Sequence, residues 1–154
     1  MIRIDNIDNN LINQYNRFHL EVINVLKDDE ALEIELKELP KEVMCCPKCS
    51  SKAIKSIGLS RLRRFKDITE DHKLATLRVS KVNYKCLDCE SIFNQENDLF
   101  YNKNLTTRMK SVVMYYVKNT NLNNCEIGRQ LGFDEKSIRR FRKELELSVQ
   151  KEAI

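Results

Sequence analysis

The chain has 154 residues, 42% of them hydrophobic, with three glycines, two prolines and no tryptophan. This composition suits one ordinary domain or two small ones and excludes a fibrous or low-complexity protein. The net charge is +4, and it divides into a net acidic segment over residues 1–44 and net basic segments over 45–104 and 105–154, which a polyanion would attract. A solvated basic surface would give the same excess.

No apolar run approaches the roughly 20 residues that cross a bilayer, and the first ten residues lack the apolar core of a signal peptide. We therefore expect a cytoplasmic protein without a membrane partner. In that reducing compartment, paired C-x-x-C motifs bind metal more often than they form disulfides.

The N-terminal part of the chain predicts a short helix followed by a β-hairpin. Apolar residues at helical spacing fall within residues 5–16. Residues 32–37 alternate apolar and charged side chains, a period of two that indicates a half-buried strand. A partner strand is expected at about 19–26, before the polar turn at Asp28 and Asp29. The acidic outer face of this hairpin is either a binding surface or simply solvated.

Two further strands are predicted before a connector. In residues 74–86 the apolar positions alternate, and their phase changes at Ser80 and Lys81. Because a one-residue slip turns all later side chains to the other face, we expect a bulge or a tight turn there. Residues 94–104 have the polar composition of a connector.

The cysteines carry the strongest signal in the sequence. Cys46 and Cys49 form one C-x-x-C pair, and Cys86 and Cys89 form a second. A two-residue spacer lets both sulfurs of a pair face one centre, so two pairs can supply four thiolates to one tetrahedral Zn²⁺. Such a metal keeps no open position and is structural. A redox-active pair would instead open a helix in a βαβ unit, which the strand-like flanks do not support.

Two cysteines fall outside this arrangement. Cys45 is the spare thiol of the first cluster, although its spacing to Cys49 also allows it to replace Cys46 as a ligand. Cys125 lies far along the chain, and we expect it to pack as a small apolar group.

Beyond residue 104 the hydrophobic period becomes helical. Residues 105–119 have one apolar stripe, and residues 124–131 predict a shorter helix that Gly132 ends in a left-handed turn. Asp134 caps a second helix, which gives the helix-turn-helix pattern. The second helix of that motif enters the major groove of DNA. Its outward face presents the candidate DNA-contacting residues Lys136, Ser137, Arg139, Arg140 and Lys143.

Together these elements predict an α+β protein with two domains. Residues 1–104 would form a small, β-rich, zinc-ribbon-like domain that includes the N-terminal hairpin. Residues 105–154 would form an all-α helix-turn-helix domain. The expected partner is double-stranded DNA, with no small-molecule substrate.

The order of these parts resembles the N-terminal region of ISL-three-type insertion-sequence transposases, over about residues 18–147. The matching residues are Cys46-Pro47-Lys48-Cys49, Arg64-Phe65-Lys66-Asp67-Ile68, Val82-Asn83-Tyr84-Lys85-Cys86, Cys89, Phe93 and Thr106-Thr107-Arg108. The resemblance implies that the zinc-binding part and the helix-turn-helix recognise the DNA ends of a mobile element. In that family a separate RNase-H-like domain carries the catalytic carboxylates.

This chain departs from the family pattern in two ways. Glu90 stands where such knuckles often have glycine, and the sequence to Ile154 includes no catalytic domain. We therefore expect no enzymatic activity.

Three functional hypotheses follow. The first is a DNA-binding protein of a mobile element, or a domesticated fragment of a transposase, that regulates transcription or recognises element ends; a homodimer would suit a two-fold DNA site. The second is a recognition subunit or fragment of a transposase that works with a separate catalytic chain. The third is a protein-interaction module, an inhibitor or adaptor, that uses the acidic hairpin.

Overall fold

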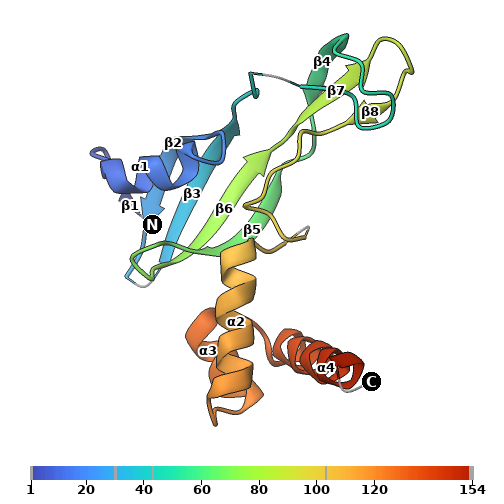
Figure 1. The fold of residues 1–154 in the computed structure, drawn as a ribbon. Helices are drawn as coiled ribbons and strands as arrows, with labels where there is room; N and C mark the ends of the chain where they lie inside the picture. The colour runs from blue at the N-terminus through green and yellow to red at the C-terminus, as the bar shows by residue number, and fades with distance from the viewer. Residues whose placement is uncertain (1, 30, 43, 103, 153–154) are drawn as a thin grey trace.

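The protein is described by a computed structural model that covers residues 2–29, 31–42, 44–102 and 104–152. These residues form eight strands in two sheets and four helices, with the strands in the first two-thirds of the chain and three helices at its C-terminal end (Figure 1). The strands are β1 (Ile2–Arg3), β2 (Leu20–Lys27), β3 (Ala31–Glu38), β4 (Ile54–Leu59), β5 (Arg63–Ile68), β6 (Leu74–Ser80), β7 (Val82–Cys86) and β8 (Ile92–Phe93). The helices are α1 (Asn9–Asn16), α2 (Thr107–Asn119), α3 (Asn124–Leu131) and α4 (Glu135–Glu152).

The larger sheet has five strands in the order β1-β2-β3-β6-β5. Strands β2 and β3 form the antiparallel hairpin that the alternating pattern predicts, with a register shift between Val22 and Asn24. Strand β3 then pairs in parallel with β6, and β5 pairs antiparallel with the other side of β6. Strand β5 is therefore an edge of this sheet, and β1 is the opposite edge.

One face of the five-stranded sheet forms the first hydrophobic core. Alternate residues of β3 and β6, such as Ile34 and Leu77, are fully buried there. Helix α1 covers this face with Tyr15, which is also fully buried, and Phe65 from β5 completes the layer. Side chains on a strand alternate between the two faces, so Arg64 and Lys66 turn to the other face of the sheet, away from this core.

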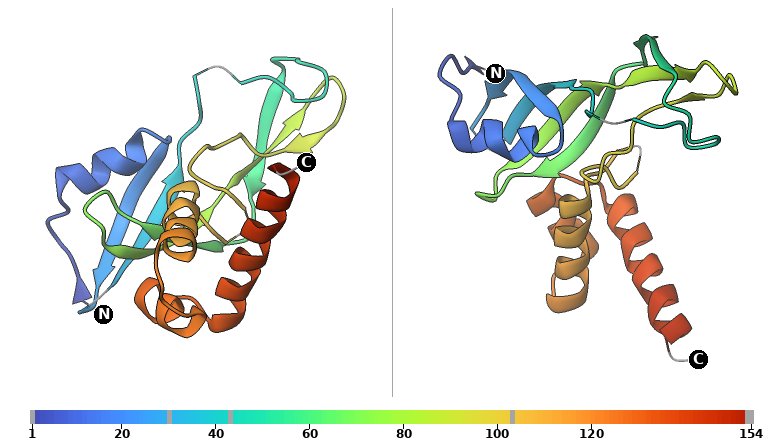
Figure 2. Two further views of the ribbon diagram at one scale, coloured as in Figure 1. Left: turned by 60° about the horizontal axis from the view of Figure 1, so that its bottom comes forward. Right: turned by 45° about the horizontal axis from the view of Figure 1, so that its top comes forward.

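The smaller sheet has three strands in the order β4-β7-β8. Strand β7 follows β6 after a single residue, Lys81, and pairs antiparallel with β4. The predicted slip at Ser80 and Lys81 is thus the point where the chain leaves one sheet and enters the other. In Figures 1 and 2 the small sheet projects from one end of the large sheet.

The prediction of a separate all-α helix-turn-helix domain is wrong, because the chain has a mixed α/β fold. The second hydrophobic core contains residues of α2, α3 and α4, but also Ile68 of β5, with Leu74 of β6 packed against it. Backbone bridges join Lys66 to Leu105 and Phe100 to Thr106, so the start of α2 is tied to the large sheet. The expectation of one β-rich unit also changes, because the strands divide between two sheets. The division into domains at residue 104 stays a prediction.

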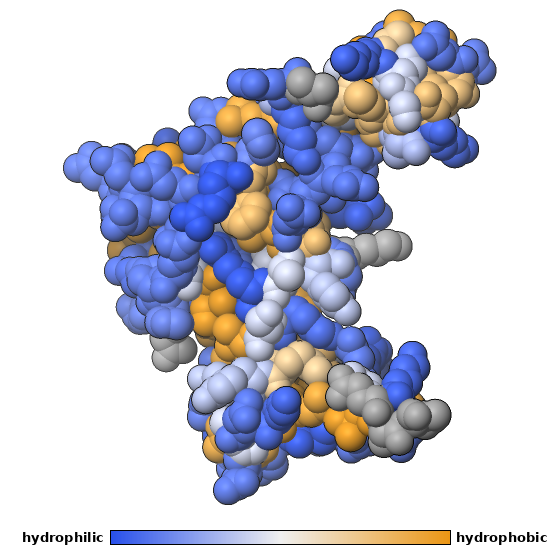
Figure 3. All heavy atoms as spheres, viewed as in Figure 1, coloured by the Kyte–Doolittle hydropathy of each residue, from blue (hydrophilic) through white to orange (hydrophobic). Residues whose placement is uncertain are grey.

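The two sheets and the helices together have the outline of a letter C. The small sheet lies at one end, and α4 lies at the other (Figure 1). Figure 3 shows the surface hollowed between these ends, with hydrophilic side chains along the back of the hollow and hydrophobic ones among those at both ends.

Candidate metal centre and basic helix

The two C-x-x-C pairs fold into two matching turns. The amide of Cys46 donates to the carbonyl of Ser51, and the amide of Ser50 donates back to the carbonyl of Cys46. The second turn repeats both bonds between Cys86, Glu90 and Ser91. Ser50 and Glu90 occupy the same left-handed backbone conformation, with φ of 61° and 63°. Glu90 therefore adopts the turn in which such knuckles often have glycine.

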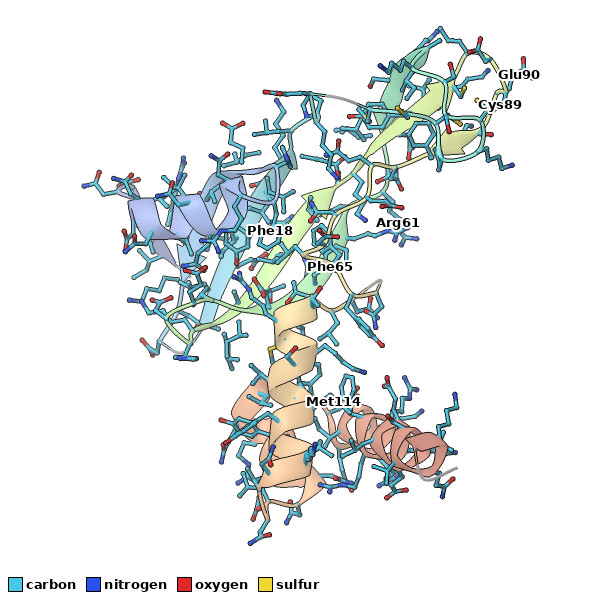
Figure 4. All side chains as sticks on the ribbon, viewed as in Figure 1. Phe18, Arg61, Phe65, Cys89, Glu90 and Met114 are labelled. Atoms are coloured by element: carbon cyan, nitrogen blue, oxygen red, sulfur yellow. The ribbon has the colours of Figure 1, made fainter. Side chains whose placement is uncertain are left out.

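These turns bring four sulfurs together at the tip of the small sheet, where Figure 4 labels Cys89 and Glu90. The Sγ atoms of Cys46 and Cys89 lie 3.5 Å apart, as do those of Cys49 and Cys86. All four lie within 4.8 Å of one another. A tetrahedron with Zn–S bonds of about 2.3 Å has edges of about 3.8 Å, so the cluster is close to the size that one ion requires.

Backbone amides and a hydroxyl support thiolates in this cluster. The hydroxyl and amide of Ser91 lower the pKa of the Cys89 thiol to about 6. The amide of Cys89 lies 3.5 Å from the Cys86 sulfur and lowers the pKa of that thiol. The Ser51 amide acts in the same direction on Cys49, but the neighbouring sulfurs raise the pKa of Cys49 to about 12. A divalent cation would relieve this crowding, since metal ligation deprotonates thiols.

The sequence prediction of the cysteine cluster is confirmed as a group of four residues that could hold a metal ion. Cys45 is exposed and lies outside the group. The prediction that Cys125 packs as an apolar group is wrong, because its side chain is exposed. Cys125 lies two residues before the buried Ile127, and a separation of two residues turns a side chain to the opposite face of a helix.

The predicted pair of helices is present at the other end of the molecule. The Asn123 side chain and the Glu126 side chain form a reciprocal capping box at the start of α3. Gly132 ends α3 with φ of +77°, in the left-handed region that glycine adopts without strain. Asp134 accepts a hydrogen bond of 2.8 Å from the amide of Ser137 and caps α4.

Helix α4 is anchored on one side and exposed on the other. Ile138 is fully buried, and Phe141 and Leu145 pack against the same core, as the helical spacing predicts. Lys136, Arg139, Arg140 and Lys143 are exposed, whereas Ser137 is partly buried. Arg139 forms an ion pair of 2.9 Å with Glu135 one turn earlier.

Some of the candidate DNA-contacting residues share a surface hollow with the large sheet. Ser137 and Arg140 line a hollow of about 720 Å³ together with Arg64 and Lys66 of β5. Lys136, Arg139 and Lys143 lie outside its lining. The ammonium of Lys66 donates to the carbonyl of Gly132 and lies 4.5 Å from the centre of the Phe133 ring.

A buried polar network, which the sequence pattern did not reveal, fixes this arrangement. The Asp67 carboxylate is fully buried and accepts two hydrogen bonds from Arg108, at 2.6 and 2.7 Å. Thr106 and Tyr15 donate to the same carboxylate at 2.6 and 2.7 Å. Burial and the Asp67 charge raise the pKa of Tyr15, so its hydroxyl stays protonated and donates. Asp67, Thr106 and Arg108 are among the residues that resemble ISL-three-type transposases, but the sequence motifs did not indicate that these residues contact one another.

Comparison of the chain with protein-family models, with curated proteins and with solved structures finds no match. Within the described part of the chain, no helix is both long and apolar enough to cross a membrane.

Proposed function

We propose that this chain is a double-stranded DNA-binding protein in which one structural Zn²⁺ holds the small sheet and α4 reads the DNA. It acts on the DNA of a mobile element, as a transcriptional regulator or as a factor that recognises the element's ends. The likeness of its cysteine, β5, β7 and α2 motifs to ISL-three-type transposases supports that biological setting.

The proposal rests on the two different sides of helix α4, one packed on the protein and the other exposed and basic. Its apolar side is held by the second core through Ile138, and its first turn is capped by Asp134. The opposite side carries four exposed basic residues over two turns, of which only Arg139 is in an ion pair among the described residues. A rigid helix with unpaired cations at its N-terminal end is the geometry that fits a major groove.

The metal part of the proposal rests on ligand chemistry. Four cysteine thiolates with two-residue spacers are the ligand set of structural zinc sites. Because all four positions of a tetrahedral ion would be filled by protein, such a metal holds the fold and takes no substrate. Purified native protein should contain one zinc per chain, and a Cys45→Ser variant should contain the same amount. A Cys86→Ser variant should lose the zinc, and native protein without metal would refute this part.

The DNA part is tested by fluorescence anisotropy with a mixed-sequence duplex at several salt concentrations. The logarithm of the affinity should fall with the logarithm of the salt concentration, by about 0.9 for each phosphate contacted. Lys136→Ala/Arg140→Ala should weaken binding and reduce this slope.

The matched control is Arg3→Ala/Lys27→Ala, which removes two exposed basic residues from the opposite edge of the large sheet. This control should bind as the native protein does. A flat salt response of the native chain, or equal losses in the two double variants, would contradict the proposal.

A further inference from the structure

Three exposed arginines lie where the chain passes from β4 into β5, at Arg61, Arg63 and Arg64. Among the described residues, none of these three arginines forms an ion pair or a side-chain hydrogen bond, whereas Arg17, Arg78 and Arg108 each form an ion pair. Exposed charges are costly to crowd on a strand without partners, since like charges repel. The fold therefore leaves this short segment with an unbalanced positive charge.

The strand that carries two of these arginines is an edge strand. Among the described residues, its backbone pairing with the connector is limited to Lys66, whose amide donates to Asn104 and whose carbonyl accepts from Thr106. Upstream of Lys66, the free edge of β5 faces away from β6. The backbone edge of β5 beside Arg63 and Arg64 is thus open, and both side chains are exposed.

The alternation of β5 turns Arg64 toward α4. Phe65 is buried in the first core, so its neighbour Arg64 lies on the other face of the strand. There Arg64 lines the same hollow as Ser137 and Arg140 from the first turns of α4. Two elements far apart in the sequence thus present cations to one space.

The acidic groups around this hollow are already engaged. Asp134 accepts the capping bond from Ser137, and Glu144 pairs with Lys110 at 2.6 Å. Lys66 is held by the carbonyl of Gly132. The Asp134 carboxylate also attracts Arg140, but Arg140 forms no ion pair among the described residues, and neither does Arg64. Arg64 and Arg140 are therefore the cations of the hollow that remain available to an external anion.

Arg61 extends the positive surface beyond the hollow, and together with Arg64 it forms a strip of positive charge. In Figure 4, Arg61 projects from the segment between β4 and β5 into the open side of the C-shaped molecule. Figure 3 shows that this side is concave, between the small sheet and α4. The strip thus lies on the inner wall of the opening, with α4 at one end.

We infer that Arg61 and Arg64 form a second DNA-contact surface, which binds the sugar-phosphate backbone of the duplex that α4 reads. Arg63 lies on the other face of β5, with Phe65, and is not part of this surface. This inference rests on the proposed function and adds a contact site on the large sheet to it. Phosphate contacts fix the position of a protein on DNA without reading its sequence, so the strip would orient α4 over its site. An extended strand edge with arginines suits phosphates, because guanidinium groups bind them through paired hydrogen bonds.

The test compares Arg61→Gln/Arg64→Gln with the native chain in the same anisotropy titrations. Loss of two phosphate contacts should weaken binding and lower the salt slope by about two. Since phosphate contacts carry no sequence information, the loss should be the same for a mixed-sequence duplex and for a preferred site. Circular dichroism checks that the fold is retained.

Two control variants distinguish a local phosphate contact from a general effect of the protein's net charge. Arg61→Lys/Arg64→Lys keeps both charges and should retain most of the salt slope. Arg3→Ala/Lys27→Ala removes two charges from the other edge of the sheet and should leave the slope unchanged.

The outcomes distinguish this inference from the proposed function. If the native chain binds with a steep salt slope and Arg61→Gln/Arg64→Gln keeps that slope, the strip is not a contact surface, although the function of α4 stands. If the native chain shows no salt-dependent binding, the proposed function itself fails. A slope that falls equally in the Arg3→Ala/Lys27→Ala control would also overturn the inference.

Discussion

At the scale of single residues, one buried carboxylate joins three parts of the fold. Asp67 of β5 accepts hydrogen bonds from Tyr15 of α1, from Thr106 at the cap of α2 and from Arg108 within α2. A buried charge is tolerated only when it is paired and fully hydrogen-bonded. The Asp67 carboxylate meets this condition because it accepts four short hydrogen bonds, two of them from Arg108. The orientation of α2 on the sheet, and with it that of α4, therefore depends on a buried residue that makes none of the proposed DNA contacts.

A second buried carboxylate, that of Glu38, has fewer hydrogen-bond donors around it. Glu38 at the end of β3 is 3% exposed, and its Oε1 accepts a long bond of 3.4 Å from the amide of Val82. Its Oε2 is buried without a hydrogen-bond partner in the described structure. Burial raises the pKa of Glu38, and the charges of Lys81 and Lys41 only partly offset it.

Because the buried Glu38 carboxylate has too few hydrogen bonds, we predict that Glu38→Gln stabilises the protein, and that the gain depends on pH. The pKa of Glu38 is higher in the folded than in the unfolded chain, so its contribution favours folding at low pH and is lost as the pH rises through the folded pKa. A neutral amide avoids this loss. The melting temperature of Glu38→Gln should exceed that of the native chain at pH 8, and the difference should shrink toward pH 5.

The exposed Glu35 of the same strand provides the control, and Glu35→Gln should melt like the native chain. A difference between Glu38→Gln and the native chain that stays constant from pH 5 to pH 8 would show that ionisation of Glu38 is not the cause.

At the scale of elements, the crossing of α3 and α4 depends on the absence of one side chain. Phe133 donates from its amide to the carbonyl of Gly128 at 2.8 Å, which draws the turn against α3. A Cβ atom at Gly128 would lie 2.5 Å from the carbonyl oxygen of Phe133. Since this obstacle is backbone, the turn itself would have to move.

We therefore predict that Gly128→Ala destabilises the protein by about 1–3 kcal/mol, the usual cost of overpacking, although alanine favours helices. Chemical denaturation measures the change in the free energy of unfolding. Gln130→Ala, at an exposed position of the same helix, should change it little. Equal or greater stability of Gly128→Ala would mean that the turn has another conformation.

Elements with local signals could be predicted from the sequence. The cysteine spacing indicated both knuckles, and Gly132 and Asp134 marked the turn between α3 and α4. The hairpin of β2 and β3 followed from its alternation. Each of these features depends on residues within a few positions of one another.

Features that depend on distant residues could not be predicted in this way. The parallel pairing of β3 with β6 joins segments about 43 residues apart, and no local pattern specifies it. The expected separate helical domain failed for the same reason, because Ile68 and Leu74 complete the helical core from two strands. The network around Asp67 also requires knowledge of the topology, since Asp67 and its donors come from three regions of the chain.

At the scale of the whole molecule, stability is divided among three regions. The first core lies between α1 and the large sheet, and the second lies among α2, α3 and α4. Neither core contains any of the four clustered cysteines. The small sheet has few buried side chains of its own, chiefly Cys46, Cys86 and Tyr84, the last stacked on Phe93 at 5.9 Å. Cores this small usually need a disulfide, a metal or a partner to stay folded, and the cysteine group could hold a metal here.

We predict that the four cysteines hold a metal, and that a chelator which removes it unfolds the small sheet and leaves the rest of the protein folded. Hydrogen exchange followed by mass spectrometry should show lost protection over residues 44–59 and 82–93. The large sheet and helices α2–α4 should retain theirs, because their cores do not depend on the cysteines. Cys45→Ser should behave as the native chain does before and after chelation. Protection lost throughout the chain would show one cooperative unit, and unchanged protection at residues 82–93 would show that no metal holds the cluster.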